Sequence, residues 1–165
     1  MKKFWDNIKD YVYIVVAVIL IRTFLVTPAI VSGPSMDDTL KDGQLVVINK
    51  LIYRFSDIAR FDIVVVNSKT MNDKIIKRVI GMPNETIEYK DNKLYINEKL
   101  VEVDLPFKET ADFTYTTKDN EYFVMGDNRP ISKDSRTVGA FSEDDIIGRV
   151  KYRLYPFSKF GKIEK

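Results

Sequence analysis

The sequence predicts a mainly β protein that carries one transmembrane helix at its N-terminus. Short runs of β-branched residues recur between residues 45 and 154, and turn-forming residues separate them, which is typical of antiparallel sheets. One long apolar stretch precedes these runs, at residues 11–31. Hydrophobic residues make up 45% of the 165 residues, an ordinary value for a chain that builds a core.

The apolar stretch has the length of one membrane span. Residues 11–21 are all apolar, Arg22 follows them, and residues 24–31 are again mostly apolar. A helix over residues 11–31 would measure about 31 Å, close to the hydrocarbon thickness of a bilayer. Pro28 is expected to end or kink this helix. A cleaved signal peptide and a buried helix are the alternatives to a retained anchor.

Charge indicates how this anchor is oriented. Lys2, Lys3 and Lys9 lie before the apolar run, so the positive-inside rule favours a cytoplasmic N-terminus. We therefore assign residues 1–31 to a cytoplasmic tail and transmembrane anchor in the cell membrane, and residues 32–165 to an extracytoplasmic β-rich domain. The net charge of +2, with both signs mixed along the chain, predicts no nucleic-acid partner.

The β-rich part is predicted from period-2 and β-branched runs, with hairpin turns at residues 90–92 and 97–99. Ser142 and the three acidic residues after it predict one helical turn. Residues 104–121 are polar with little periodicity and predict a loop-rich insertion. The predicted strands are residues 45–48, 63–66, 75–80, 86–89, 93–96, 100–103, 122–125 and 148–154.

Two residue types are absent from the chain. Without cysteine there is no disulfide, thiol nucleophile or cysteine-bound zinc, and without histidine there is no Ser-His-Asp triad and no histidine metal site. A hydrolase built from this chain therefore needs a lysine, a carboxylate, a tyrosine or the N-terminal amine as its base. A site for Mg²⁺ or Ca²⁺ built from carboxylates alone stays open, but no spacing typical of a calcium loop occurs, and no metal or cofactor is predicted.

Two residues are candidates for such chemistry. Gly33 and Pro34 restrict the backbone before Ser35, as a turn that presents a hydroxyl and a backbone N–H requires, although an ordinary turn serine fits the same pattern. In a strand, Lys77 shares an apolar face with Ile75 and Val79. Burial there would lower the pKa of the Lys77 amine, while an edge-strand lysine that limits aggregation is the alternative.

A third candidate region is the loop at residues 126–136, which is dense in turn formers and charges. It is either a solvated loop with surface ion pairs or a brace for a site.

Together, four motifs in this order resemble type I signal peptidases, especially the short Gram-positive form. They lie at residues 32–40, 60–65, 77–81 and 126–136, beyond an apolar anchor, and Ser35 and Lys77 are 42 residues apart.

The resemblance implies a Ser/Lys serine endopeptidase with a signal-peptidase-like antiparallel β-sheet domain. Ser35 would attack the scissile carbonyl, its backbone N–H would bind the oxyanion, and Lys77 would be the general base. The Ser132 hydroxyl would orient the Lys77 amine. Asp134 and Arg136 would form a bracing ion pair, with Asp127 and Arg129 as further support.

The resemblance also implies the partners. Substrates would be secretory preproteins with small residues at −1 and −3, bound in extended form beside a strand. Membrane lipid and the secretion machinery would be the other partners. Residues 51–55 would either form an apolar lip at the membrane or pack in the core.

The chain departs from the family pattern at three positions. Gly33 stands where some relatives have the serine that completes the oxyanion hole, so that role is left open for Ser32. Asp38 replaces a proline, and Phe61 replaces a glycine. These changes allow two other readings within the family, a specialised enzyme for a pilin or another restricted client, and a non-catalytic homologue in pilus or surface-protein assembly. Outside it, a self-cleaving repressor-type protease and a β-rich binding module are the alternatives.

Overall fold

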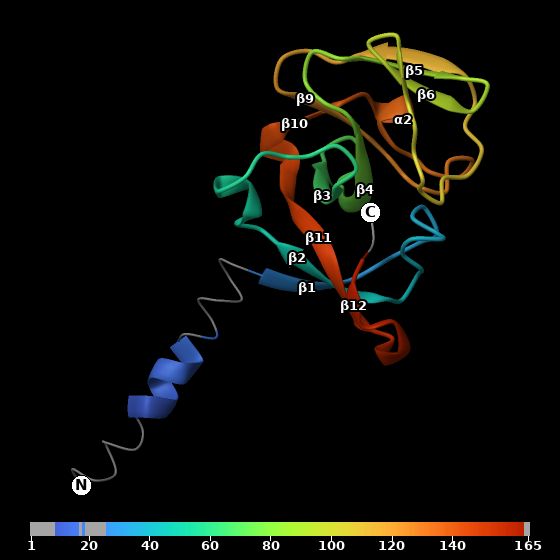
Figure 1. The fold of residues 1–165 in the computed structure, drawn as a ribbon. Coiled ribbons are helices and arrows are strands. Elements are labelled where there is room, and N and C mark those ends of the chain that lie inside the picture. The colour runs from blue at the N-terminus through green and yellow to red at the C-terminus, as the bar shows by residue number, and fades with distance from the viewer. Residues whose placement is uncertain (1–8, 17, 19–25, 164–165) are drawn as a thin grey trace, which may run out of the picture.

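The computed structural model describes residues 9–16, 18 and 26–163. These residues form two antiparallel sheets, with the smaller sheet at one end of the larger one (Figure 1). The larger sheet has eight strands in the order β1-β2-β11-β3-β4-β9-β10, and β12 pairs with β11. Its strands are β1 (Val26–Ile30), β2 (Leu45–Asn49), β3 (Ile63–Ser68), β4 (Asp73–Gly81), β9 (Glu121–Met125), β10 (Phe141–Ser142), β11 (Ile146–Tyr155) and β12 (Gly161–Lys162).

The smaller sheet has the order β7-β6-β5-β8. Its strands are β5 (Thr86–Lys90), β6 (Lys93–Ile96), β7 (Lys99–Val101) and β8 (Phe113–Thr116). Both predicted hairpin turns are confirmed. Asp91 and Asn92 join β5 to β6, and Asn97 and Glu98 join β6 to β7, all four with positive φ. Two consecutive positive φ values match the right-handed twist of hairpin strands.

Four short helices complete the body: η2 (Ile52–Arg54), α2 (Ser135–Val138), η3 (Glu143–Asp145) and η4 (Phe157–Lys159). The helical turn predicted after Ser142 is confirmed as η3, which begins with a capping box between Ser142 and Asp145. All eight predicted strands are present. The predicted strand at residues 100–103 is the most displaced, because β7 ends at Val101.

The predicted helix over residues 11–31 is wrong at its C-terminal end. Residues 9–16 and 18 are helical, but Val26–Ile30 form β1, which pairs with β2. Pro28 is tolerated there because β1 is an edge strand, where a missing N–H leaves no ladder bond unmade. Within the described residues, no helix is both long and apolar enough to cross a membrane. The rest of the predicted anchor, at residues 17 and 19–25, lies outside the described residues.

The predicted loop at residues 104–121 contains one strand that the sequence reading missed. Phe113–Thr116 pair with β5, and Phe113 and Tyr115 pack against the core cluster under the small sheet. Phe123 stacks on Phe113 with ring centroids 5.6 Å apart. The alternating aromatic residues span only four positions within a polar segment, so the sequence pattern does not predict a strand there. The strand forms because these side chains pack in the core.

Strand β4 brings the candidate site together. Ile76 packs against the cluster around β1 and β2, Val79 lies in the cluster between β3 and β9, and Ile80 lies under the small sheet. The strand is central in its sheet, between β3 and β9. Lys77 pairs with Val64 of β3 and lies just beyond the β4–β9 ladder, which begins at Arg78. Its 3% exposed fraction is what argues against a solvated edge-strand lysine.

Candidate active site

Ser35 lies in a tight turn that is anchored on both sides. The amides of Thr39 and Leu40 both donate to the Met36 carbonyl, and the side chains of Met36 and Leu40 are buried in the core. The amide of Asn128 donates to the Ser35 carbonyl at 3.1 Å. The half-buried Ser35 is thus fixed by the core below it and by the loop after β9.

Lys77 extends from β4 to Ser35. Its Nζ donates to the Ser35 Oγ at 2.7 Å, and Lys77 is only 3% exposed. Desolvation by burial lowers the pKa of Lys77 to about 8, although the charges of Asp134 and Asp127 oppose this shift and that of Arg136 favours it. A buried amine with this pKa is partly neutral near neutral pH and can then accept a proton from the hydroxyl beside it.

A fully buried ion pair lies next to this contact. Arg78 Nε and Nη2 donate to Asp127 Oδ1 and Oδ2 at 2.9 and 2.7 Å, and neither side chain is exposed. The Thr39 hydroxyl also donates to Asp127 Oδ2. Because Thr39 belongs to the turn of Ser35, the pair connects β4, the loop after β9 and that turn.

A second ion pair braces the loop from the other side. Arg136 Nε and Nη2 donate to Asp134 Oδ1 and Oδ2, both at 2.8 Å. Asp134 also accepts from the amide of Gly126 at 3.0 Å and caps α2. The Arg136 guanidinium donates to the Arg129 carbonyl at 2.7 Å, so this pair holds the whole loop in one shape.

Ser132 is buried beside the site but does not make the predicted hydrogen bond. Its Oγ has no hydrogen-bond partner among the described residues. A Cβ placed on Gly126 would contact both the Ser132 Oγ and the Ser35 carbonyl oxygen, so these two atoms lie close together against the same face of Gly126. The hydroxyl is therefore close to the Ser35 turn, with its hydrogen-bonding capacity unused.

Gly126→Ala is expected to lower the rate of peptide cleavage sharply, because the new methyl group must displace the Ser35 carbonyl or Ser132. Steady-state cleavage and the thermal midpoint of unfolding, measured on the same sample, check this. Gly43→Ala is the control for strain without crowding: its φ of 76° disfavours alanine, but no atom lies within 4 Å of a Cβ at that exposed position. Equal cleavage rates in the two variants would contradict the close approach at Gly126.

Arg129 does not pair with Asp127. Its guanidinium carbon lies 4.0 Å from the ring centroid of Phe107 and 5.0 Å from that of Tyr89, and Nη1 donates to Thr110 at 3.1 Å. Arg129 is 1% exposed, so the aromatic faces replace water around the charge. The resemblance implied that Arg129 supports the site. The residues that contact its guanidinium, however, are Tyr89, Phe107 and Thr110, and none of them belongs to the predicted site.

The two substituted positions both have left-handed backbone. Asp38 has φ 79°, which the proline ring cannot adopt, and its carboxylate pairs with Lys108 Nζ at 2.8 Å. Phe61 has φ 69°, which glycine adopts readily and a bulky residue rarely does. The Phe61 amide donates to Val79 and its carbonyl accepts from Arg78, so these bonds hold the backbone in that shape.

The structure brings together most of the side chains predicted for the site. Ser35, Lys77, Asp127, Asp134 and Arg136 are linked by the contacts above. Ser32 is exposed, and Gly33, which follows it, has φ 82° and donates to Asp42. No cluster of three or more acidic side chains that could hold a metal ion occurs in the described part of the chain.

Sequence reasoning missed Arg78 and Thr39, the two partners of Asp127. A signal for Arg78 was present: it alternates with Ile76 and Ile80 on one face of a predicted strand. A charged residue on a buried face requires a counter-ion, and an acidic residue in a later motif is the expected source. Thr39 has no comparable signal, because threonine is common in turns.

Comparisons with known proteins give one consistent family. The family model described as signal peptidase, peptidase S26, matches residues 4–155. The chain is 37% identical over 166 residues to signal peptidase IB of Staphylococcus aureus, which covers 88% of this chain and 86% of that protein. It is 39% identical over 164 residues to signal peptidase I T of Bacillus subtilis, covering 92% and 85% of the two chains.

A solved structure agrees with these relatives. The crystal structure of a signal peptidase I from Enterococcus faecalis V583 is 34% identical in sequence and superposes with a TM-score of 0.53. The match covers 57% of this chain and 97% of that chain.

Proposed function

This chain belongs to the signal peptidase family, peptidase S26, and on that basis we propose that Ser35 and Lys77 form its catalytic dyad. The chain is a serine endopeptidase that removes signal peptides from preproteins. The observation that carries the proposed dyad is the 2.7 Å contact between the buried Lys77 Nζ and the Ser35 Oγ. Lys77 is fixed on a central strand and Ser35 on a core-anchored turn, so the contact is preorganised.

The first half of the proposed reaction forms an acyl-enzyme. Neutral Lys77 accepts the hydroxyl proton of Ser35, and the Ser35 Oγ attacks the scissile carbonyl carbon. We propose that the backbone N–H of Ser35 donates to the oxyanion that develops. When the tetrahedral intermediate collapses, the C–N bond breaks, and protonated Lys77 gives its proton to the leaving amine of the mature chain.

The second half releases the signal peptide. A water molecule gives a proton to Lys77 and attacks the ester carbonyl on Ser35. Collapse of the second intermediate breaks the ester bond, and Lys77 returns the proton to Oγ. Water and peptide bond are consumed, and the enzyme regains its initial protonation state.

The supporting residues have a proposed role in keeping Lys77 oriented. Asp127 and Asp134 each hold a guanidinium and so present neutralised charges near Lys77, which limits how far they raise its pKa. The unpartnered Ser132 hydroxyl is the proposed group that orients the amine when a substrate moves the side chains of the dyad. An oxyanion role for Ser32 stays a prediction.

The finer substrate preference is also a proposal. We expect small residues at −1 and −3, as the family resemblance implies. An extended substrate backbone is expected because an edge strand such as β1, which precedes the Ser35 turn, offers unpaired backbone groups. Signal-peptide variants with a large residue at −1 should therefore be cleaved much more slowly than the parent peptide.

We propose that the body works at the cell membrane, with the cytoplasmic tail and single-pass anchor in the residues that precede β1. Support comes from exposed apolar side chains near β1, since Ile30, Tyr155, Phe157 and Phe160 are 69, 52, 82 and 68% exposed and line one shallow groove. Lipid and the secretion machinery are the proposed partners. The predicted lip at residues 51–55 keeps one strongly exposed apolar residue, Phe55.

A non-catalytic role in pilus or surface-protein assembly is not favoured. Such a role would not need a desolvated lysine against a serine, and the relatives named above are signal peptidases. Specialisation for a restricted client is a separate proposal. Its support is limited to Asp38 and Phe61, the two positions where the chain departs from the proline and glycine of the family pattern.

Cleavage is expected to rise with pH through about 8, the pKa of Lys77. The sign follows because the neutral amine is the base, and its fraction grows as pH passes upward through this pKa. Initial rates on a labelled preprotein, measured at subsaturating substrate between about pH 5 and pH 9, check this. A flat profile would argue against a lysine base.

A further inference from the structure

The peptide unit between Pro34 and Ser35 carries the N–H that the proposed mechanism assigns to the oxyanion. On its other side, the Pro34 carbonyl accepts from the Asp37 amide at 3.1 Å and from Asn128 Nδ2 at 3.2 Å. Among the described residues, no group accepts a hydrogen bond from the Ser35 N–H. The carbonyl end of this peptide unit is therefore held, and its N–H end stays available to a substrate.

Asn128 holds the backbone on both sides of the Ser35 Cα. Its side-chain amide donates to the Pro34 carbonyl, and its backbone amide donates to the Ser35 carbonyl at 3.1 Å. The peptide bond before Ser35 is trans, so its N–H points in the direction opposite to its carbonyl. By holding the Pro34 carbonyl on one side, Asn128 therefore directs the Ser35 N–H to the other side.

The Gly33-Pro34 sequence alone does not keep this peptide unit from turning over. The ring of Pro34 fixes φ but allows ψ in both the helical and the extended region, and a change of ψ reverses the carbonyl and the N–H of the unit that follows. In the reversed state a carbonyl oxygen, and not a donor, would face the developing oxyanion. The two hydrogen bonds on the Pro34 carbonyl oppose this reversal, and the bond from Asn128 is the one that a side-chain substitution can remove.

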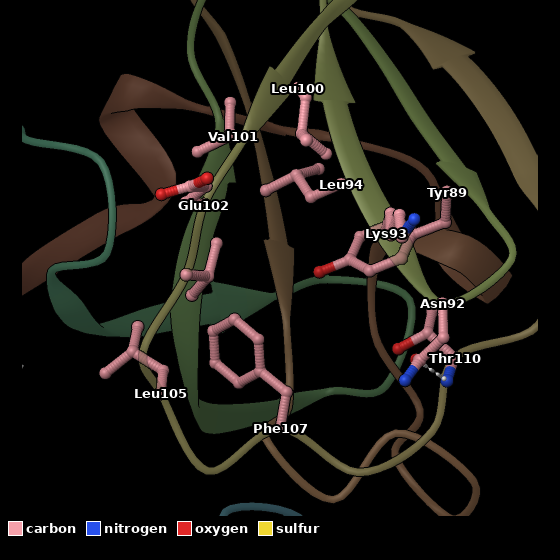
Figure 2. Close-up of a pocket in the computed structure, with 11 residues that line it drawn as sticks. Tyr89, Asn92, Lys93, Leu94, Leu100, Val101, Glu102, Leu105, Phe107 and Thr110 are labelled. Carbon is pink, nitrogen blue, oxygen red and sulfur yellow. Dashed lines mark hydrogen bonds between the residues drawn. The ribbon is translucent and has the colours of Figure 1, made fainter.

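Contacts on both of its neighbours set the position of Asn128. The Asp127 carbonyl accepts from the Lys108 amide at 3.0 Å. The Arg129 guanidinium lies against the ring of Phe107, which Figure 2 shows on the segment that follows β7, beside the cavity under the small sheet. The loop around Asn128 is thus anchored outside the Ser35 turn, which makes Asn128 a fixed reference for that turn.

We propose that Asn128 is a positioning residue for the reaction: its side-chain amide keeps the peptide unit before Ser35 in the orientation that aims the Ser35 N–H at the oxyanion. This inference rests on the proposed dyad and oxyanion donor. Asn128 acts through the peptide unit and not on the substrate. Because the oxyanion develops only on the way to the transition state, loss of the Asn128 donor should lower kcat and leave KM unchanged.

Asn128→Ala and Asn128→Asp test this in the full chain in liposomes. Both variants keep the backbone amide that holds the Ser35 carbonyl and lose the side-chain donor, and aspartate also keeps the shape of asparagine. We expect kcat for a labelled preprotein to fall by about two- to tenfold, the population equivalent of one net hydrogen bond. Asn67→Ala, at an exposed position on β3, is the control and should keep the parental kcat.

The atom that carries the developing charge separates a misplaced donor from a misplaced nucleophile. A peptide ester and the matching thionoester place oxygen or sulfur at that position, and sulfur is the weaker hydrogen-bond acceptor. The parent should cleave the ester faster, and in both Asn128 variants the ester-to-thionoester ratio should fall by about the factor by which kcat falls. Both substrates use the same Ser35 hydroxyl and Lys77 amine, so a defect in the dyad would lower both rates equally.

Three results would overturn the proposal: a parental kcat in both variants, a rise in KM in place of the fall in kcat, or a fall in kcat with an unchanged ester-to-thionoester ratio. A shifted midpoint of the pH profile in Asn128→Ala would also overturn it, because Asn128 would then act on Lys77. If thermal unfolding shows that Asn128→Ala does not fold, the rate ratio of Asn128→Asp decides.

Lys77→Ala in the same assay separates this inference from the proposed dyad. Cleavage by Lys77→Ala would refute the dyad itself. Inactive Lys77→Ala together with parental Asn128 variants would refute only the role of Asn128.

Discussion

Replacing Lys77 with alanine is expected to reduce preprotein cleavage by about 10²–10⁴-fold or more, the usual contribution of a positioned general base. The loss follows because Lys77 Nζ is the one side-chain group among the described residues that hydrogen-bonds to the Ser35 Oγ. Ser35→Ala should be at least as severe, since it removes the nucleophile. Single-turnover cleavage of a labelled preprotein by the full chain in liposomes measures both.

The matched control is Lys74→Ala, an exposed lysine on the same strand, which should cleave at the parental rate. Lys77→Arg separates charge from basicity, because arginine keeps a positive charge but does not give up its proton. It should be as inactive as Lys77→Ala. Thermal unfolding of each variant shows whether the fold is intact, and substantial cleavage by a folded Lys77→Ala protein would refute the dyad.

Asp127→Ala is expected to cost about 3–5 kcal/mol of unfolding free energy, the typical effect of removing one partner from a buried ion pair. Arg78 would keep its charge with no exposed surface and no counter-ion, and Thr39 would lose its acceptor. For a chain of this size the melting temperature should fall by about 6–20 °C. Calorimetry or circular dichroism of the full chain in detergent measures the shift.

The double variant Arg78→Met with Asp127→Leu tests the cause of this loss. It removes both charges and keeps apolar volume, so it should be more stable than Asp127→Ala. Asp144→Ala, at an exposed position in η3, is the control and should melt within a few degrees of the parent. A double variant no more stable than Asp127→Ala would mean that the uncompensated charge is not the cause.

Local chemistry made most strands predictable. Runs of β-branched residues at 63–66 and 75–80 match β3 and β4, and both hairpin turns follow from Asp, Asn and Glu at residues that need positive φ. In each case the determining residues are adjacent in the chain. The motif order likewise identified Ser35 and Lys77, whose contact the structure contains.

The N-terminal boundary shows where local reasoning fails. Val26–Ile30 are mostly apolar, so the predicted anchor included them, although Pro28 was expected to end or kink its helix. They form β1 because β2 offers a pairing edge, and that edge exists only after the sheet has formed. The same holds for β8, whose aromatic residues gain their stabilisation from Phe123 in a later strand.

By itself, the sequence determined the kinds of residue available for chemistry: one serine after Gly-Pro, one lysine on an apolar strand face, and no histidine or cysteine. For Arg78 and Arg129, only the tertiary structure decided which groups their charges meet. Arg78 pairs with Asp127, 49 residues away, while Arg129, only two residues from Asp127, lies against Phe107 and Tyr89. Pairing inside a core depends on which surfaces pack together and exclude water, and no spacing along the chain encodes that outcome directly.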